Sequence, residues 1–198
     1  MLVLGIDTAF YYLNLTLIKD DLVIASHHEK CFRNQAELLV PNIEKLLKKV
    51  DLTCQEIDAM VISKGPGSYT GIRIAMSFAK VFCSVKNIPL YTLSTLLLYS
   101  GLKPTLTLID ARASRCFFSI YNQGRVIVED CIIENSEALK MRTKHLEYHI
   151  YGDGHLIGEP DDFPCISENF LLLKDYWQII ENIHLLKPEY LKEEDAYG

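Results

Sequence analysis

The chain has 198 residues, 49% hydrophobic and 23% charged, a composition typical of a folded protein with one sizeable core or two small lobes. Its formal net charge is −6 and its lysines and arginines are scattered, which argues against a protein that binds nucleic acid unaided. Because it has no Cys-x-x-Cys pair, no signal-peptide pattern and no run of about 18 apolar residues, we expect a cytoplasmic protein with reduced thiols and no membrane contact.

The first part of the chain predicts three strands joined by short turns. Residues 2–6 form an apolar run that ends at Asp7, and leucines alternate with polar residues over 13–17. After the turn at Lys19-Asp20-Asp21, residues 22–31 form a third extended run. Three successive strands with short connections predict a β-meander.

Helices and strands then alternate. They are expected, in chain order, as a helix over 34–49, a strand over 59–63, a helix over 72–85, a strand over 87–91 and a helix over 93–101. Pro41 lies inside the first of these helices and should kink it, because proline removes one backbone hydrogen bond. The order βββαβαβα predicts a mixed sheet covered by helices.

The most informative segment is the glycine-rich turn Lys64-Gly65-Pro66-Gly67-Ser68-Tyr69-Thr70-Gly71-Ile72-Arg73. A turn of this kind between a strand and a helix can present backbone N–H groups and the positive end of the helix to a phosphate or carboxylate. The alternative is a tight turn that only connects the two elements. It is neither a Walker A loop, since no Gly-Lys-Ser/Thr follows, nor a dinucleotide-binding fingerprint.

The second half of the chain begins like the first, with a strand over 105–109 that ends at Asp110. Further elements are expected as a hairpin of 116–121 with 125–133, a helical patch over 136–141, a strand over 148–151 and a helix-like stretch over 169–183. We place the boundary between two lobes near residue 103, with one lobe over 1–103 and a smaller one over 104–198.

Two histidine pairs invite a metal-site interpretation that the predicted elements do not favour. On a helix His145 and His149 would share one face and could bind zinc, but residues 148–151 are typical of a strand, which separates the two rings. His27 and His28 are neighbours on a predicted strand, so they point to opposite faces. We therefore expect no metal site at either pair.

Six segments occur in an order that resembles a known family. They are Leu4-Gly5-Ile6-Asp7-Thr8, Arg33-Asn34-Gln35-Ala36-Glu37-Leu38-Leu39-Val40-Pro41, the block Gly65–Arg73, Ile109-Asp110-Ala111-Arg112, Gly152-Asp153-Gly154 and Pro188-Glu189-Tyr190-Leu191. Together they are similar to the TsaB (YeaZ) family. The resemblance implies an α/β actin/Hsp70-like (ASKHA) fold, with two RNase H-like lobes of mixed sheets flanked by helices and a shortened C-terminal lobe.

The same resemblance implies a function in the biosynthesis of threonylcarbamoyladenosine (t6A). Such proteins are scaffold subunits that support TsaD, which transfers threonylcarbamoyl to adenosine 37 of tRNAs that read ANN codons. The resemblance implies a heterodimer with TsaD, TsaE in a larger complex and only indirect contact with tRNA. ATP or ADP and a metal ion are expected in TsaD, and no cofactor is assigned to this chain. Whether the chain alone forms a homodimer is left open.

The metal ligands of TsaD-like enzymes have no counterpart here. Their His-His-Leu-Glu-Gly-His run corresponds to Ser94-Thr95-Leu96-Leu97-Leu98-Tyr99, where Thr95 and Tyr99 replace the ligating imidazoles. A neutral hydroxyl does not substitute for an imidazole as a metal ligand. We therefore expect a partner subunit without catalytic residues, not an enzyme.

The partner surface is expected on the first two helices, which would pack against the same elements of TsaD. Leu38, Leu39, Ile72, Ala75 and Phe78 are the candidates, and simple core packing is the alternative for each of them.

A second hypothesis is an independent actin-like ATPase. Residues that would surround a nucleotide, or else form only a structural turn, are Asp7, Thr8, Gly65, Gly67, Ser68 and Gly71. Asp7 could hold a magnesium-bound water or simply cap a turn, and Asp110 has the same two alternatives. A metallopeptidase is a weaker third hypothesis, because the His-x-x-x-His pattern is missing from the corresponding helix.

Overall fold

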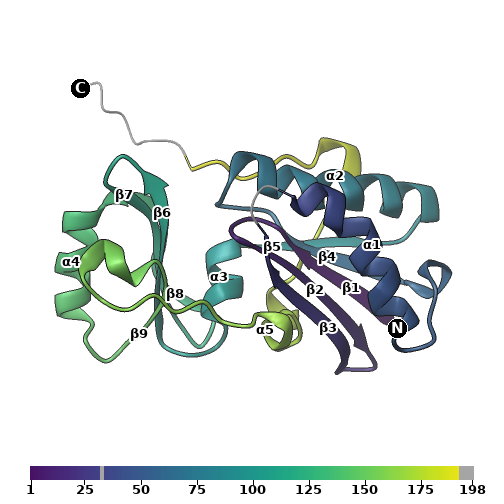
Figure 1. Ribbon diagram of the computed structural model, residues 1–198, viewed down its shortest axis with the longest axis horizontal. Helices are drawn as coiled ribbons and strands as arrows, with labels where there is room; N and C mark the ends of the chain where they lie inside the picture. The colour runs from purple at the N-terminus through teal and green to yellow at the C-terminus, as the bar shows by residue number, and fades with distance from the viewer. Residues whose placement is uncertain (32–33, 192–198) are drawn as a thin grey trace.

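The computed structural model describes residues 1–31 and 34–191, and Figure 1 shows two lobes, each built on its own sheet. The strand order is β10-β5-β4-β1-β2-β3 in the larger sheet and β8-β7-β6-β9 in the smaller one. The strands are β1 (Leu2–Asp7), β2 (Tyr12–Lys19), β3 (Leu22–Lys30), β4 (Ala59–Ser63), β5 (Leu90–Leu93), β6 (Thr105–Arg112), β7 (Arg115–Asn122), β8 (Arg125–Glu134), β9 (His149–Gly152) and β10 (Gln178–Ile179). The α-helices are α1 (Gln35–Lys48), α2 (Tyr69–Lys86), α3 (Thr95–Ser100), α4 (Asn135–Lys144) and α5 (Ser167–Leu172).

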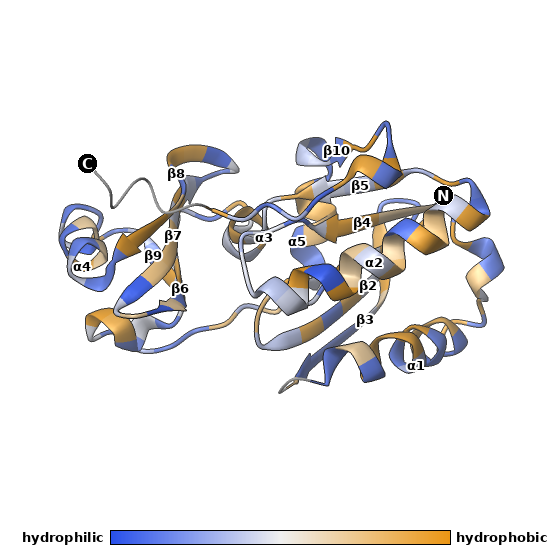
Figure 2. Ribbon diagram, turned by 90° about the horizontal axis from the view of Figure 1, so that it is seen from above, coloured by the Kyte–Doolittle hydropathy of each residue, from blue (hydrophilic) through white to orange (hydrophobic). Residues whose placement is uncertain are grey.

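The larger sheet is mixed and is covered on both faces. Strand β1 pairs antiparallel with β2 and parallel with β4, as the meander followed by alternating elements predicts. Helices α1 and α2 lie on one face, and α5 lies on the other (Figure 1). Helix α5 packs closely on its face of the sheet, since a Cβ added at Gly5 would lie 3.0 Å from the ring of Phe170. In Figure 2 the turns of α1 alternate between blue and orange, as an amphipathic helix does.

The smaller sheet repeats the pattern at the centre of the larger one. Strand β6 pairs antiparallel with β7 and parallel with β9, as β1 does with β2 and β4. Helix α3 packs against β6 and β7 and lies between the two sheets, and α4 packs against β7 and β8 (Figure 1). Leu106, Phe118 and Ile120 are fully buried at the centre of this lobe. The predicted mixed sheets flanked by helices are confirmed.

The C-terminal part of the chain returns to the larger lobe. Ile166, Phe170 and Leu173 are buried in the larger core, and β10 adds to the edge of the larger sheet beside β5. The predicted helix over 169–183 is therefore wrong beyond Leu172. The indole Nε1 of Trp177 donates to the Phe170 carbonyl at 3.0 Å, and the chain then extends to satisfy the open backbone groups of β5. The lobe boundary near residue 103 stays a proposal, but within the smaller lobe expected over 104–198 the stretch 166–179 packs with the larger lobe instead.

Two helix details differ from the sequence-based expectations or refine them. Helix α1 continues through Pro41 as one element. Helix α2 begins at Tyr69, three residues earlier than predicted, because the Ser68 side chain accepts a hydrogen bond from the Gly71 N–H and caps it. Among the described residues, no helix combines the length and the apolar character needed to cross a bilayer.

Candidate functional site

A groove lies on the surface of the larger lobe between α1 and α2. It has a volume of about 450 Å³. It is lined by Ala36, Leu39, Val40, Tyr69, Thr70, Arg73, Ile74, Ser77 and Phe78. Val40 is 45% exposed and Tyr69 is 60% exposed, so two large apolar side chains of this lining face solvent. An exposed apolar groove with a polar rim is typical of a surface that binds another protein.

The aromatic side chains of the groove are held in place by their neighbours. Tyr69 stacks on Tyr190, with ring centroids 5.1 Å apart, and the guanidinium of Arg73 lies over the Tyr69 ring at 5.0 Å. Phe78 stacks on Phe82 at 5.5 Å within α2. Ring contacts of this kind fix the orientation of the side chains before any partner binds.

The five predicted interface residues divide into two groups. Leu39, Ile72 and Ala75 are between 0% and 3% exposed and pack in the chain's own core, so core packing, the alternative weighed for them, describes their position. Ala75, with no exposed surface, is the most fully enclosed of the three. Leu38 and Phe78 are partly exposed, and their role in a partner surface stays a prediction.

The glycine-rich turn packs against the chain itself. The Thr8 hydroxyl donates to the Gly71 carbonyl at 2.7 Å and accepts from the Ala75 N–H at 3.3 Å. Three backbone N–H groups of the turn are also occupied: Gly65 donates to the Thr95 hydroxyl at 3.2 Å, Ser68 to the Ala9 carbonyl at 2.8 Å and Gly71 to the Ser68 hydroxyl. N–H groups already bonded within the chain are not available to a phosphate. This arrangement favours the structural alternative for the turn.

The C-terminal segment closes over the same turn. The Glu189 N–H donates to the Lys64 carbonyl at 2.8 Å, and the Glu189 carboxylate pairs with the Lys64 ammonium at 3.0 Å. A Cβ added at Gly65 would lie 2.4 Å from the Glu189 carbonyl oxygen. Two of the sequence motifs that lie far apart along the chain are therefore packed together, and the glycine is needed for that contact.

We expect Gly71→Ala to destabilise the protein by about 1–3 kcal/mol. The added Cβ would lie 2.2 Å from the Thr8 carbonyl oxygen, which is a backbone atom and moves only with β1. For a chain of this size the loss lowers the melting temperature by roughly 3–10 °C in thermal denaturation. Thr70→Ala, a substitution at the exposed neighbouring position, is the control and should change it by no more than about 1–2 °C. Equal melting curves for Gly71→Ala and the wild type would show that the turn is not tightly packed.

Asp7 is fully buried at the end of β1. Its carboxylate accepts hydrogen bonds from the Ser63 hydroxyl at 2.6 Å, the Asn14 amide at 3.0 Å, the Ala9 N–H at 3.2 Å and the Tyr99 hydroxyl at 3.4 Å. Burial raises the pKa of Asp7, and these hydrogen bonds oppose the rise. A carboxylate enclosed by four donors has no open side for a magnesium-bound water, which favours the structural role.

The raised pKa of Asp7 has a consequence for stability. Because the folded state holds the Asp7 proton more tightly than the unfolded state, its contribution to stability is full below the ordinary value of 3.8 and is lost as pH rises through the higher folded pKa. The unfolding free energy of the wild type, compared with that of Asp7→Asn, should therefore fall as pH rises through this window. Urea unfolding of both proteins across the acidic range measures it. A difference that stays constant or grows with pH would contradict a raised pKa.

Thr95 and Tyr99, which the family resemblance aligns with metal-ligating imidazoles, have structural partners. Thr95 is fully buried, and its hydroxyl accepts a hydrogen bond from the Gly65 N–H. Tyr99 is 1% exposed, and its hydroxyl donates a hydrogen bond to the Asp7 carboxylate. The Phe10 ring meets the Tyr99 ring edge-on at 5.5 Å. Helix α3, where the metal ligands would lie, thus contacts the end of β1, the glycine-rich turn and the core through these two side chains.

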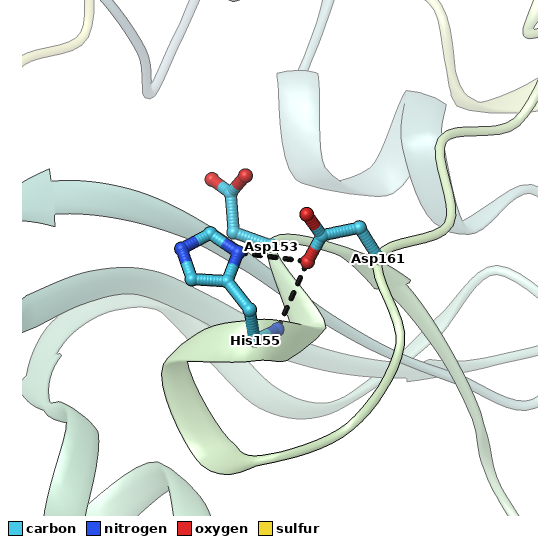
Figure 3. A group of neighbouring side chains, drawn as sticks. All are labelled: Asp153, His155 and Asp161. Carbon is cyan, nitrogen blue, oxygen red and sulfur yellow. Dashed lines mark hydrogen bonds and ion pairs between the residues drawn. The ribbon is translucent and has the colours of Figure 1, made fainter.

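A cluster of three possible metal ligands lies where β9 ends, and the sequence did not predict it. Asp153, His155 and Asp161 approach one another there (Figure 3), and one potential ligand atom from each lies within 4.8 Å of the others. Asp153 belongs to the predicted Gly-Asp-Gly segment, but His155 and Asp161 are six residues apart in an irregular stretch. No periodic pattern indicates that the two lie side by side. Asp110 lies nearby, since its N–H donates to the Asp153 carboxylate at 2.7 Å.

The two histidine pairs considered at the outset have separate partners. His145 ends α4 and meets the Tyr148 ring at 5.3 Å, whereas the Nε2 of His149, at the start of β9, lies 2.8 Å from the Asp162 carboxylate. The predicted strand over 148–151 is confirmed, shifted by one residue. His27 pairs with Glu29 at 3.0 Å, and His28 bonds to Asn14.

Comparison with known proteins places the chain in a family. The sequence model described as TsaD, tRNA N6-adenosine threonylcarbamoyltransferase, matches residues 25–170. The tRNA threonylcarbamoyladenosine biosynthesis protein TsaB of Bacillus subtilis is 30% identical over 146 residues, which are 70% of this chain and 63% of that protein. The match therefore spans less than two thirds of that relative. The TsaB protein of Buchnera aphidicola is 26% identical over 77% of this chain and 79% of its own length.

A solved structure supports the fold over nearly the whole chain. YeaZ from Pseudomonas aeruginosa superposes with a TM-score of 0.74 at 19% identity, covering 96% of this chain and 99% of that one. Together with the mixed sheets described above, this confirms the predicted α/β fold with two lobes of mixed sheets flanked by helices.

Proposed function

The chain belongs to the family whose sequence model is described as TsaD, and proteins named TsaB and YeaZ are among its relatives; from this premise we propose that it acts in t6A biosynthesis as a non-catalytic subunit. Its partner would be TsaD, which carries out the threonylcarbamoyl transfer, with TsaE joining a larger complex. Contact with tRNA would be made through the complex, because the chain carries a net charge of −6.

The observation that carries the proposal is the apolar groove between α1 and α2. Its lining includes Val40 and Tyr69, which expose 45% and 60% of their surface, and a soluble protein gains by covering such side chains. On the same outer side of α2, Val81 and Val85 are 66% and 80% exposed. A pair of amphipathic helices from a partner of similar fold would fill the groove and extend the apolar contact along α2.

The positions of Thr95, Tyr99 and Asp7 support a non-catalytic role. Each is buried and bonded within the larger lobe, so the region that would hold a metal and nucleotide in an active relative is filled by side chains. The same packing weighs against the ATPase hypothesis. A metallopeptidase has no support at this helix, because neither hydroxyl replaces an imidazole.

Co-expression with the TsaD protein of the same organism tests the proposal. We expect the tagged chain to retain TsaD as a complex that runs as one species in size-exclusion chromatography. Depletion of the chain in cells should lower the t6A content of total tRNA, measured by nucleoside mass spectrometry. A chain that recovers no TsaD at micromolar concentrations, or whose loss leaves t6A unchanged, would overturn the proposal.

The same groove bears on the homodimer question. If α1 and α2 of two copies cover each other when the chain is alone, addition of TsaD should convert the dimer into a heterodimer. Light scattering coupled to size-exclusion chromatography distinguishes the two species by mass.

A further inference from the structure

The cluster at the end of β9 is built on a tightly closed loop. Gly152 and Asp162 exchange backbone hydrogen bonds at 2.6 and 3.1 Å, and the Glu159 N–H donates to the Gly154 carbonyl at 3.0 Å. A Cβ added at Gly154 would lie 2.1 Å from the Pro160 carbonyl oxygen, so the two sides of the loop are in direct contact. The loop therefore holds Asp153 and Asp161 close together without help from a ligand.

The three side chains of the cluster differ in burial. Asp153 is only 4% exposed: its Oδ2 accepts from the Asp110 N–H at 2.7 Å and from the Tyr11 hydroxyl at 3.2 Å. Among the described residues, its other carboxylate oxygen has no hydrogen-bond donor. The Nδ1 of His155 lies 2.8 Å from Oδ1 of Asp161, and these two side chains are 61% and 46% exposed (Figure 3). One buried carboxylate, held by two hydrogen bonds, thus lies within 4.8 Å of ligand atoms on two exposed side chains.

The negative charge around the cluster is balanced only in part: His155 pairs with Asp161, and Lys30 acts electrostatically on the same carboxylate. In residues 1–31 and 34–191, no lysine or arginine forms an ion pair with Asp110, Asp153 or Asp161. The Asp110 N–H donates to Asp153, and Asp153 and Asp161 have carboxylate oxygens within 4.8 Å of each other, so the three acidic residues share one small region. A buried carboxylate without a cationic partner is costly to ionise, and a bound cation would remove that cost.

We propose that Asp153, His155 and Asp161 bind one Zn²⁺ ion at the junction of the two lobes. Two carboxylate oxygens and one imidazole nitrogen are ligands that zinc accepts, and the imidazole disfavours Mg²⁺ and Ca²⁺, which prefer oxygen alone. With bonds of about 2.1 Å, the ligand atoms must lie within about 4.2 Å of one another, compared with the 4.8 Å limit observed. Rotation of the two exposed side chains supplies the difference. Three protein ligands leave a fourth position for water.

The site ties the lobes together as well as holding an ion. Asp153 belongs to the smaller lobe, and the Tyr11 hydroxyl that bonds to it comes from the segment between β1 and β2 of the larger lobe. Zinc binding should therefore stabilise the whole fold, because an ion that binds only the native state shifts the unfolding equilibrium.

Titration of the full chain with ZnCl₂ tests the site. The untagged protein, carrying Cys165→Ser to remove its exposed thiol, is treated with a chelator and then titrated in a calorimeter. We expect one Zn²⁺ per chain, a higher melting temperature in its presence and no binding of Mg²⁺ at the same concentrations. His155→Ala and Asp161→Asn should each weaken Zn²⁺ binding at least tenfold and abolish the rise in melting temperature.

The chain offers a matched control in a second pair on the same lobe. His149 and Asp162 are also 2.8 Å apart, with side chains 50% and 51% exposed, but no third ligand from the described part of the chain lies beside them. His149→Ala should leave Zn²⁺ affinity unchanged. The proposal fails if the chain takes up no stoichiometric Zn²⁺, if His155→Ala binds it as the parent does, or if His149→Ala weakens binding as much as His155→Ala. None of these outcomes bears on the binding of TsaD.

Discussion

Ala75→Arg is expected to unfold the protein or to lower its melting temperature by more than about 10 °C. Ala75 is fully buried on the side of α2 that faces the sheet, and its N–H donates to the Thr8 hydroxyl. A guanidinium placed there has no carboxylate partner and no path to water, which costs several kcal/mol. Since a native domain is stable by only about 5–15 kcal/mol, this single change removes much of the total.

Val81→Arg is the control for the same helix. Val81 is 66% exposed, so the same charged side chain reaches water there, and the unfolding free energy should change by no more than about 0.5 kcal/mol. Circular dichroism during thermal unfolding compares the two variants. Equal melting temperatures for Ala75→Arg and Val81→Arg would mean that α2 does not pack on the sheet through Ala75.

The fold follows from the sequence wherever apolar periodicity is strong. Strands β1, β2 and β4 and helices α1 and α2 were all predicted, because each buries one consistent set of side chains. The extended chain after Leu172 was not predicted. Its apolar residues are compatible with a helix, and the chain is extended only because it pairs with the open edge of β5. Local propensity does not contain that information.

The candidate site was predictable only in part. Sequence identifies α1 and α2 as amphipathic, but it does not divide Ala75, which faces the sheet, from Val40, which faces solvent. The glycines at 65 and 71 suggested a ligand, whereas the structure uses them for close contact with the chain's own backbone at Glu189 and Thr8. The Asp153 cluster is formed by a loop closure between residues without periodic spacing, so no sequence pattern could reveal it.

Val40→Glu is expected to weaken TsaD binding by about 100-fold, which corresponds to about 2.7 kcal/mol. Val40 lines the groove and is already 45% exposed in the free chain, so a carboxylate there is solvated and the fold is retained. In the complex the same carboxylate would lie in an apolar contact without a partner charge, and its desolvation opposes association. Val126→Glu, on β8 of the other lobe, makes the same change at a side chain that is 52% exposed and serves as the control.

The dissociation constants of TsaD from the wild type, Val40→Glu and Val126→Glu, measured by calorimetry at one salt concentration, test the partner surface most directly. The groove between α1 and α2 predicts native affinity for Val126→Glu and about a hundredfold loss for Val40→Glu, with both variants melting within about 2 °C of the wild type. Native affinity for a folded Val40→Glu would contradict the assignment of this groove as the surface that binds TsaD.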